Sequence, residues 1–468
     1  MIPAGSRVHF IGIGGAGMSA IASVLIARGF TVSGSDLRES EITRRLRAAG
    51  ARIQIGHAAE HVEPGHVVVI SRAVPETNVE VQMARQRGAR VLHRAEMLGG
   101  LMEGLHGIAV VGTHGKTTTT SMIARILEQA GRDPTVLIGG EVDDFGGNAR
   151  TGRGKDLVAE VDESDGSLLQ VSPHVAVVTN LDATDHLDFY GSLDQVLLTF
   201  RQFLGRLPAH GLAVVCADAD AGQRLAAALD EAGRVRMVTY GLQPGAAYTA
   251  RVLEMAGTRT AFEVRCRDLT LGRVTLAVPG AYNVQNALGA VAVSVELGVP
   301  FGEAAAALRT FRGVQRRFTV RGEIGGILVV DDYAHNPTKV HALLRAAREC
   351  WPAHRIIAVF QPHRYTRTRT VGAQFAGAFG PADEVIITSL YAADEPPIPG
   401  VDAGVIVRAV SALRTVQYIA EPSQVVGHLE SRVRPGDLVL TIGAGDVWQI
   451  GDALVARLRT RAAEAAGA

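Results

Sequence analysis

The residues with the clearest chemical meaning form the run Gly-Thr-His-Gly-Lys-Thr-Thr-Thr-Thr at positions 112–120. An apolar run at 108–111 precedes it and apolar residues recur at helical spacing over 122–127, so the pattern predicts a strand, a phosphate loop and a helix. Backbone amides and a helix N-terminus attract phosphate oxygens, a lysine ammonium neutralises the outer phosphates, and a threonine hydroxyl can bind Mg²⁺. The loop is shorter than the general G-x-x-x-x-G-K-[ST] pattern, because only two residues separate its glycines. It predicts ATP as the ligand, and the alternative is an ordinary strand-to-helix turn. The expected contacts are Gly112, Thr113, His114, Gly115, Lys116, Thr117 and Thr118.

A second glycine loop follows the apolar strand at 8–13. Positions 12–17 match G-x-G-x-x-G, and Asp36 lies about 20 residues further on, as in the dinucleotide-binding fingerprint. The pattern shows that a diphosphate can approach a helix N-terminus, but NAD and other nucleotides both fit it. Asp36 could bind a sugar or cap a turn. Ser71 ends a further strand at 66–70, where open α/β sheets place ligand contacts, although a plain strand-end hydroxyl explains it equally well.

A buried-type strand that begins at 157 runs into carboxylates within 160–165. Glu160, Asp162 and Asp165 are candidates for holding Mg²⁺ beside the Lys-Thr pair, since a carboxylate at a neighbouring strand end has this role in phosphate-loop folds. The next strand, at 175–179, leads to His186, which faces the same loop if the strands are neighbours. Asn283 and Asn286 lie one helical turn apart at a helix start, where they could cap the helix or present two amides to a ligand.

Three polar clusters follow apolar strands in the last third of the chain, at 331–337, 361–369 and 443–446. Arginines in such a position suit two-point recognition of carboxylate or phosphate. We expect this role for Arg364, whereas Arg369 fits a solvated face.

These motifs must be positioned by alternating strands and helices. The predicted fold is α/β with three domains: a Rossmann-like domain over 1–94, a central ATP-binding domain over 95–311 and a second Rossmann-like domain over 312–468. The central domain combines a phosphate-loop ATPase-like sheet with extra antiparallel strands at about 247–279, whose turns we place at Gly257 and Gly272. In the last domain we expect strands at 327–330, 355–360, 384–387 and 438–442.

Composition narrows the partners. Lys+Arg and Asp+Glu both number 47 and the pI is near 7.3, which argues against a nucleic-acid or membrane-surface partner. The three cysteines are far apart and outside metal-ligand spacing, so we expect reduced thiols. No signal peptide and no apolar run long enough to span a membrane is apparent, which favours a cytoplasmic protein. The oligomeric state is not predicted.

Taken together, the motifs resemble those of the Mur ligases, which build peptidoglycan precursors. The resemblance runs through all three predicted domains and rests on the segments 112–120, 160–165, 179–186, 283–286, 331–337 and 443–446. The segments 12–19 and 360–367 resemble the branch of the family that adds the first amino acid. Absence of lysine from 193–207 also favours that branch, because later-acting ligases commonly carry a carbamylated lysine there.

The resemblance implies an ATP- and Mg²⁺-dependent amide synthesis in cell-wall formation. The lactyl carboxylate of UDP-N-acetylmuramate attacks the γ-phosphate of ATP, and the amine of L-alanine then attacks the acyl phosphate. Lys116 would hold the β- and γ-phosphates, Thr117 and Glu160 the first Mg²⁺, and His186 a second Mg²⁺ or the carboxylate. Asn283 and Asn286 would lie near the nucleotide. The residues that would face the reacting carboxylates and phosphate are Tyr333, His335, Arg364 and Arg367. Those that would hold UDP are Gly12, Gly14, Gly15, Ala16, Gly17, Met18, Asp36 and Ser71.

Several alternative interpretations fit parts of the same sequence. Related alanine ligases often read His-His-Pro-Thr-Glu where this chain has Asn336 and Lys339 after His335, which alters the charge of the amino-acid pocket. A recycling ligase that attaches a whole peptide is a close rival. An NAD(P)-dependent oxidoreductase would explain the first glycine loop but not Lys116, and a nucleotide switch would not need Arg364.

Overall fold

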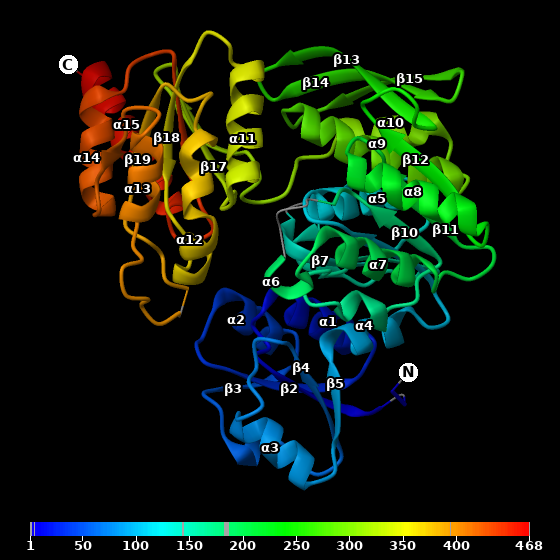
Figure 1. Ribbon diagram of the computed structural model, residues 1–468. Coiled ribbons are helices and arrows are strands. Elements are labelled where there is room, and N and C mark those ends of the chain that lie inside the picture. The colour runs from blue at the N-terminus through cyan, green and yellow to red at the C-terminus, as the bar shows by residue number, and fades with distance from the viewer. Residues whose placement is uncertain (1, 4, 143–144, 182–186, 394, 468) are drawn as a thin grey trace. The chain divides into compact units, whose positions relative to one another are not determined.

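The computed structural model describes residues 2–3, 5–142, 145–181, 187–393 and 395–467. Helices separate most of the strands along the chain, and the strands form three sheets (Figure 1). The chain divides into two compact units. Unit 1 comprises Met1–Arg251, Phe262–Thr275 and Asn283–Arg312, and unit 2 comprises Val252–Ala261, Leu276–Tyr282 and Gly313–Ala468. Among the described helices, none is long and apolar enough to cross a membrane.

The first sheet of unit 1 is parallel, with the order β3-β2-β1-β4-β5. Side chains of its central strand alternate between the two faces: Val8 and Phe10 join the core that includes α1, whereas Ile11 joins that of α3. Its strands are β1 (Arg7–Ile11), β2 (Thr31–Asp36), β3 (Arg52–Ile55), β4 (His66–Ile70) and β5 (Arg90–His93), and its helices are α1 (Ala16–Ala27), α2 (Glu41–Ala48) and α3 (Val79–Gln86).

The second sheet has ten strands in the order β15-β14-β13-β12-β11-β10-β6-β9-β7-β8. Strand β6 lies between β10 and β9 and is parallel to both, so the ends of these strands meet at the phosphate loop. The strands are β6 (His106–Val111), β7 (Thr135–Val142), β8 (Gly147–Arg150), β9 (Asp156–Glu160), β10 (Val175–Val178), β11 (Leu212–Cys216), β12 (Arg236–Gly241), β13 (Tyr248–Ala256), β14 (Arg259–Cys266) and β15 (Leu269–Leu276). The helices are α4 (Arg94–Met102), α5 (Lys116–Gln129), α6 (Leu187–Tyr190), α7 (Leu193–Leu204), α8 (Asp220–Ala232), α9 (Ala281–Glu296) and α10 (Phe301–Arg309).

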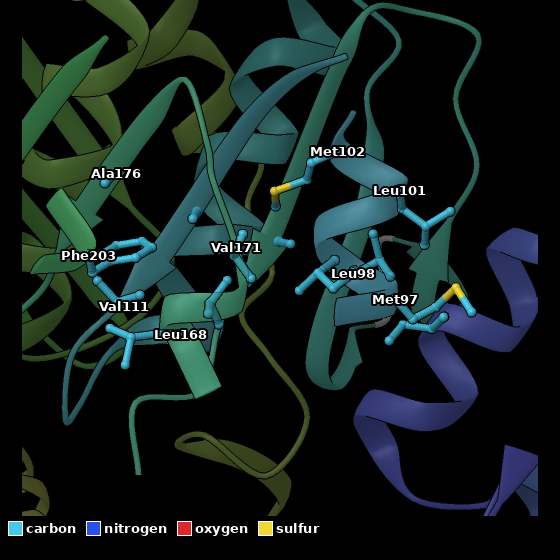
Figure 2. Close-up of a cluster of buried hydrophobic side chains, with 14 of the residues drawn as sticks. Met97, Leu98, Leu101, Met102, Val111, Leu168, Val171, Ala176 and Phe203 are labelled. Carbon is cyan, nitrogen blue, oxygen red and sulfur yellow. The ribbon is translucent and has the colours of Figure 1, made fainter. Parts of the chain in front are cut away.

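Helix α4 is fixed to this sheet by a continuous apolar core. Figure 2 shows Leu98 and Met102 of α4 beside Val171 and Leu168, with Phe203 further along the same cluster. All five side chains are at most 7% exposed. The helix that follows β5 is therefore a packed element and not a free linker.

The third sheet, in unit 2, has the order β16-β17-β21-β18-β19-β20. Only β16 is antiparallel to its neighbour. Helices α14 and α15 cover one face and α11 the other, as two separate cores show (Figure 1). The strands are β16 (Thr319–Ile324), β17 (Ile327–Asp332), β18 (Arg355–Phe360), β19 (Glu384–Ile387), β20 (Gln417–Tyr418) and β21 (Asp437–Ile442), and the helices are α11 (Pro337–Cys350), α12 (Tyr365–Val371), α13 (Gly404–Ser411), α14 (Pro422–Arg432) and α15 (Trp448–Gly467).

The predicted α/β fold class is confirmed, with two corrections. Strands β16 and β20 add to the four that were expected in the last sheet. Gly257 does lie at a turn, but Gly272 lies inside β15, and the second turn falls between Cys266 and Leu269. Gly272 has a φ of +141°, and a Cβ there would come within 2.9 Å of the Phe301 ring. Close packing of that ring, and not a turn, explains the glycine.

Candidate active site

The phosphate loop connects β6 to α5 and needs both of its glycines. Gly112 and Gly115 have φ values of +122° and +79°. A Cβ at Gly112 would lie 2.5 Å from the Thr179 hydroxyl, at the end of the neighbouring strand β10. The next residue, Asn180, accepts the His114 N–H at 2.9 Å. The loop is thus held against the end of β10. A residue larger than glycine would not fit at position 112.

The two asparagines of α9 lie at this loop. A Cβ at Gly115 would come within 2.2 Å of the Asn286 side-chain oxygen. Thr119, in the first turn of α5, donates to the same oxygen at 3.4 Å, and the Asn286 amide donates to Asn283 at 3.3 Å. The structure therefore brings these amides beside the predicted ATP loop.

Lys116 has a partner that the sequence did not reveal. Its Nζ donates to Glu163 Oε1 at 2.8 Å and to the Gly112 carbonyl at 2.6 Å. The Glu163 side chain is 3% exposed and that of Lys116 is 14% exposed. Burial disfavours the ammonium form, but Glu163 and Glu160 outweigh it, so the pKa of Lys116 lies above its usual value. The lysine is a cation at all physiological pH values.

Thr117 and Glu160 are adjacent, as the metal prediction requires. The Thr117 hydroxyl donates to Glu160 Oε2 at 2.9 Å, and the Gly139 N–H donates to the same oxygen at 2.9 Å. Hydroxyl and carboxylate oxygens are ligands that Mg²⁺ prefers, so these residues fit the ion. Within the described ranges no group of three or more His, Cys, Asp or Glu could hold a metal. His186 lies outside the described residues.

The other two candidate carboxylates have different partners. Asp162 Oδ2 accepts from Arg94 Nη2 at 2.5 Å, and Asp165 accepts the Ser167 N–H at 3.0 Å. Asp162 is thus part of an ion pair between the end of β9 and the start of α4.

Asp36 stabilises the first glycine loop. This carboxylate accepts the Gly14 N–H at 2.8 Å, which fixes the turn before α1. Gly17 lies against Arg94, whose Nη1 would be 2.6 Å from a Cβ at that position. Met18 is 2% exposed and belongs to the core, so a contact with UDP could come only from its backbone. Ser71 directly follows β4.

One pocket joins the two glycine loops. It has a volume of about 300 Å³ and is lined by Ala16 and Gly17 of the first loop and by Lys116 of the second. Arg94, Glu160 and Asp162 complete its charged lining. Two sites that the sequence presents 100 residues apart therefore share one cavity within unit 1.

Unit 2 holds the predicted Tyr333 and His335 in the turn after β17. Asp332 accepts the Ala334 N–H at 2.7 Å, and Asn336 caps α11 by accepting the Lys339 N–H at 2.9 Å. The unusual Asn336 therefore has a structural role. His335 Nδ1 lies 2.9 Å from the Tyr333 carbonyl. A carbonyl only accepts, so Nδ1 carries the proton and Nε2 carries the lone pair.

A second histidine lies beside His335. The rings of His335 and His363 are 6.1 Å apart, and His363 stacks on Tyr391 at 5.7 Å. Arg367 Nη1 donates to His363 Nδ1 at 2.9 Å, and Arg364 has a φ of +70° at the start of α12. Burial is the main cause that lowers the pKa of His363 to about 4, with Arg367 adding to it; burial also lowers the pKa of His335 well below its usual value. Both rings are neutral near pH 7.

Arg316 supports this cluster without having been predicted. Its guanidinium donates to Asp331 at 3.0 Å and to the Gly443 and Gly445 carbonyls at 2.6 and 3.0 Å. It also lies 5.2 Å from the Tyr333 ring centre. The segments after β17 and β21 are thereby tied together.

Comparison with known proteins places these features in one family. Residues 7–106 match the model "Mur ligase family, catalytic domain", 110–294 match "Mur ligase middle domain", and 316–445 match "Mur ligase, glutamate ligase domain". The chain is 48% identical over 455 residues to the UDP-N-acetylmuramate–L-alanine ligase of Geotalea uraniireducens, covering 97% of this chain and 98% of that protein. The chain belongs to the Mur ligase family.

Other Mur ligases support the assignment. The UDP-N-acetylmuramate–L-alanine ligase of Geobacter sp. strain M21 is 49% identical, with 97% of this chain and 98% of that one covered. The crystal structure of a UDP-N-acetylmuramate-alanine ligase from Thermotoga maritima has a TM-score of 0.81 and 31% identity, over 97% and 99% of the two chains. A murein peptide ligase from Psychrobacter arcticus has a TM-score of 0.69 and 26% identity, over 97% and 99%.

Membership of the Mur ligases confirms the resemblance and the predicted three-domain α/β fold. It also confirms an ATP-dependent acid:amino-acid ligase and leaves the oxidoreductase interpretation without support. The roles of individual site residues stay predictions. Three supporting residues were missed, Glu163, Arg94 and Arg316; only Glu163 carried a signal, because it lies in the acidic run after β9.

Proposed function

We propose that this chain joins L-alanine to the lactyl carboxylate of UDP-N-acetylmuramate, with ATP converted to ADP and phosphate. The observation that supports the chemistry is that Lys116 and Glu160 line the same pocket as the first glycine loop. Relatives that are 48–49% identical, with 98% of their own length covered, are named for these two substrates. The product is a precursor for peptidoglycan synthesis.

The first step is a phosphoryl transfer to a carboxylate. A carboxylate oxygen of the sugar forms a bond to the γ-phosphorus while the bond to the β,γ-bridging oxygen breaks, so ADP leaves and an acyl phosphate forms. Such a step needs positioning and positive charge more than a base, and Lys116 supplies a buried, permanently charged ammonium. Thr117 and Glu160 would hold Mg²⁺, which supplies further positive charge at the phosphates.

The second step forms the amide. The amine nitrogen attacks the acyl carbon, the bond to the phosphate oxygen breaks, and a proton must leave the nitrogen. His335 offers this proton a lone pair on Nε2 of a neutral ring, and its lowered pKa makes it a weak base at that position. Arg364 and Arg367 suit the carboxylate of alanine or the departing phosphate.

Hydroxylamine trapping tests the intermediate. Incubation with ATP, UDP-N-acetylmuramate and hydroxylamine, without alanine, should yield the hydroxamate of the sugar. Absence of hydroxamate, or its formation without ATP, would contradict the proposal.

A peptide-recycling ligase is the second candidate, since a murein peptide ligase shares the fold at lower identity. Offering L-alanine and a tripeptide as competing acceptors separates the two functions. We expect the alanine product to dominate, because the alanine ligases are more similar to this chain both in sequence and in structure.

A further inference from the structure

A second cavity, larger than the candidate active site, lies in unit 1. Its volume is about 650 Å³, within the range of small-molecule sites. It is lined by the end of α1, strand β5, helix α4, the segment before β10 and the loop after α7. No step of the proposed reaction uses it.

The cavity has an apolar lining that could hold the body of an organic molecule. Leu25, Leu92, Met97, Leu101 and Met102 line it, and all are at most 6% exposed overall. Figure 2 shows Met97, Leu101 and Met102 along α4, where they belong to the core. Soft methionine side chains adapt to ligands of different shape.

Three arginines from separate elements also line this cavity: Arg28 after α1, Arg90 at the start of β5 and Arg206 after α7. Two carboxylates line it as well, Glu96 and Glu103. In the part of the chain that the structure describes, none of the three arginines lies within ion-pair distance of a carboxylate. All three arginines are exposed residues, and partial burial lowers the pKa of Arg28 below its usual value. The three arginines outnumber the two carboxylates of the cavity by one, so an anionic group would balance the excess positive charge.

We propose that this cavity binds a small amphipathic anion, an organic carboxylate, sulfonate or phosphate with an apolar body. The arginines bind the acidic head, and the methionine and leucine side chains pack against the apolar part. An inorganic anion would leave the apolar lining unused.

Helix α4 couples this second cavity to the candidate active site. Arg94, Ala95 and Leu98 line the active-site pocket, whereas Met97, Leu101 and other residues of the same helix line the second cavity. The helix also carries Arg94, which pairs with Asp162 in the pocket. We expect a ligand bound against α4 to alter the position of Arg94, and the affinity for the UDP-sugar to change with it.

Fluorescence of 1-anilinonaphthalene-8-sulfonate tests the binding. The full-length chain, saturated with ADP and UDP-N-acetylmuramate, is titrated with this dye, and we expect saturable binding. The variant Arg28→Ala/Arg90→Ala should bind it at least 10-fold more weakly. Arg206→Ala should weaken binding too. The control Arg47→Ala/Arg85→Ala removes two exposed arginines of the same sheet domain and should bind like the wild type.

Octanesulfonate should displace the dye, and methanesulfonate at the same concentration should not. Equal dye affinity in the wild type and Arg28→Ala/Arg90→Ala, with unchanged ADP binding, would overturn the proposal. Loss of dye binding on adding ADP and the UDP-sugar, or equal displacement by methanesulfonate, would also overturn it.

The coupling is measured separately, since it rests on the proposed function. Octanesulfonate should change the KM for UDP-N-acetylmuramate at least twofold in the wild type but not in Arg28→Ala/Arg90→Ala. An unchanged KM in the wild type would overturn the coupling and leave the binding result standing.

Discussion

Lys116 and Glu163 form a buried ion pair beneath the phosphate loop, with side chains 14% and 3% exposed. Removing one member of a buried ion pair takes away the opposite charge that neutralised the other member, which typically costs about 3–5 kcal/mol. Lys116→Ala should therefore lower the free energy of unfolding by roughly 3 kcal/mol and abolish hydroxamate formation. Urea denaturation and hydroxylamine trapping measure the two effects.

A double variant separates the two roles of Lys116. Lys116→Ala/Glu163→Gln also removes the carboxylate charge that the lysine neutralised, so it should recover part of the stability but none of the hydroxamate. Lys155→Ala, at an exposed lysine, is the matched control and should behave like the wild type. Wild-type trapping by Lys116→Ala would refute the role assigned to the lysine.

His363 makes stability depend on pH in a defined window. Burial, with Arg367 and Arg364, lowers its pKa from 6.5 to about 4 in the folded chain. Between these values the unfolded chain binds more protons, so the free energy of unfolding falls as pH drops from about 6.5 to about 4. His363→Asn should reduce this slope, by roughly 1–2 kcal/mol over the window once solvent screening is considered.

Denaturation at pH 7 and pH 4.5 measures the effect of His363→Asn. Exposed His341 is the matched control, and His341→Asn should leave the slope unchanged. The same slope in His363→Asn and the wild type would show that this ring is not the group responsible.

At the scale of elements, the phosphate loop depends on the close approach of α5 and α9. Gly115 and Gly131 have similar φ values, +79° and +72°, but only Gly115 faces Asn286, whose side-chain oxygen would lie 2.2 Å from an added Cβ. Gly115→Ala should raise the KM for ATP at least 10-fold, whereas Gly131→Ala should cost only the backbone strain, about 1 kcal/mol of stability. Steady-state kinetics and thermal denaturation compare them. Equal effects of the two substitutions would mean that strain, and not the α5–α9 contact, is what matters.

The elements also show what the sequence could predict. Strands such as β6, β9 and β10 were recognisable because buried parallel strands read as continuous apolar runs before glycine or polar residues. The strand β20 has two residues and β3 has four, too short for a periodic signal. Gly272 was misplaced because a glycine that admits a packed ring looks the same in sequence as a turn glycine.

The proximity of the candidate residues was predictable where strand order fixes it. Lys116, Thr117 and Glu160 follow from strand ends that must meet at one edge of a parallel sheet. The Lys116–Glu163 pair was not predictable, because which carboxylate of an acidic run reaches the loop depends on the local turn. Arg94 and Arg316 belong to segments distant in sequence from their partners, and only packing brings them there.

At the scale of the whole molecule, the chain separates its chemistry between two units. Unit 1 combines the phosphate loop and the first glycine loop in one pocket, and unit 2 carries the histidine and arginine cluster. This division suits a reaction with two steps, activation of a carboxylate and then capture by an amine. The balanced net charge agrees with small-molecule substrates.

The most direct test of the proposed ligase activity is steady-state ADP release with substrates omitted in turn. Sustained turnover should require both UDP-N-acetylmuramate and L-alanine, and glycine or L-serine should support it less well, by the 10- to 200-fold that about 1–3 kcal/mol allows. ADP release that continues at the same rate without the UDP-sugar, or without any amino acid, would contradict the account.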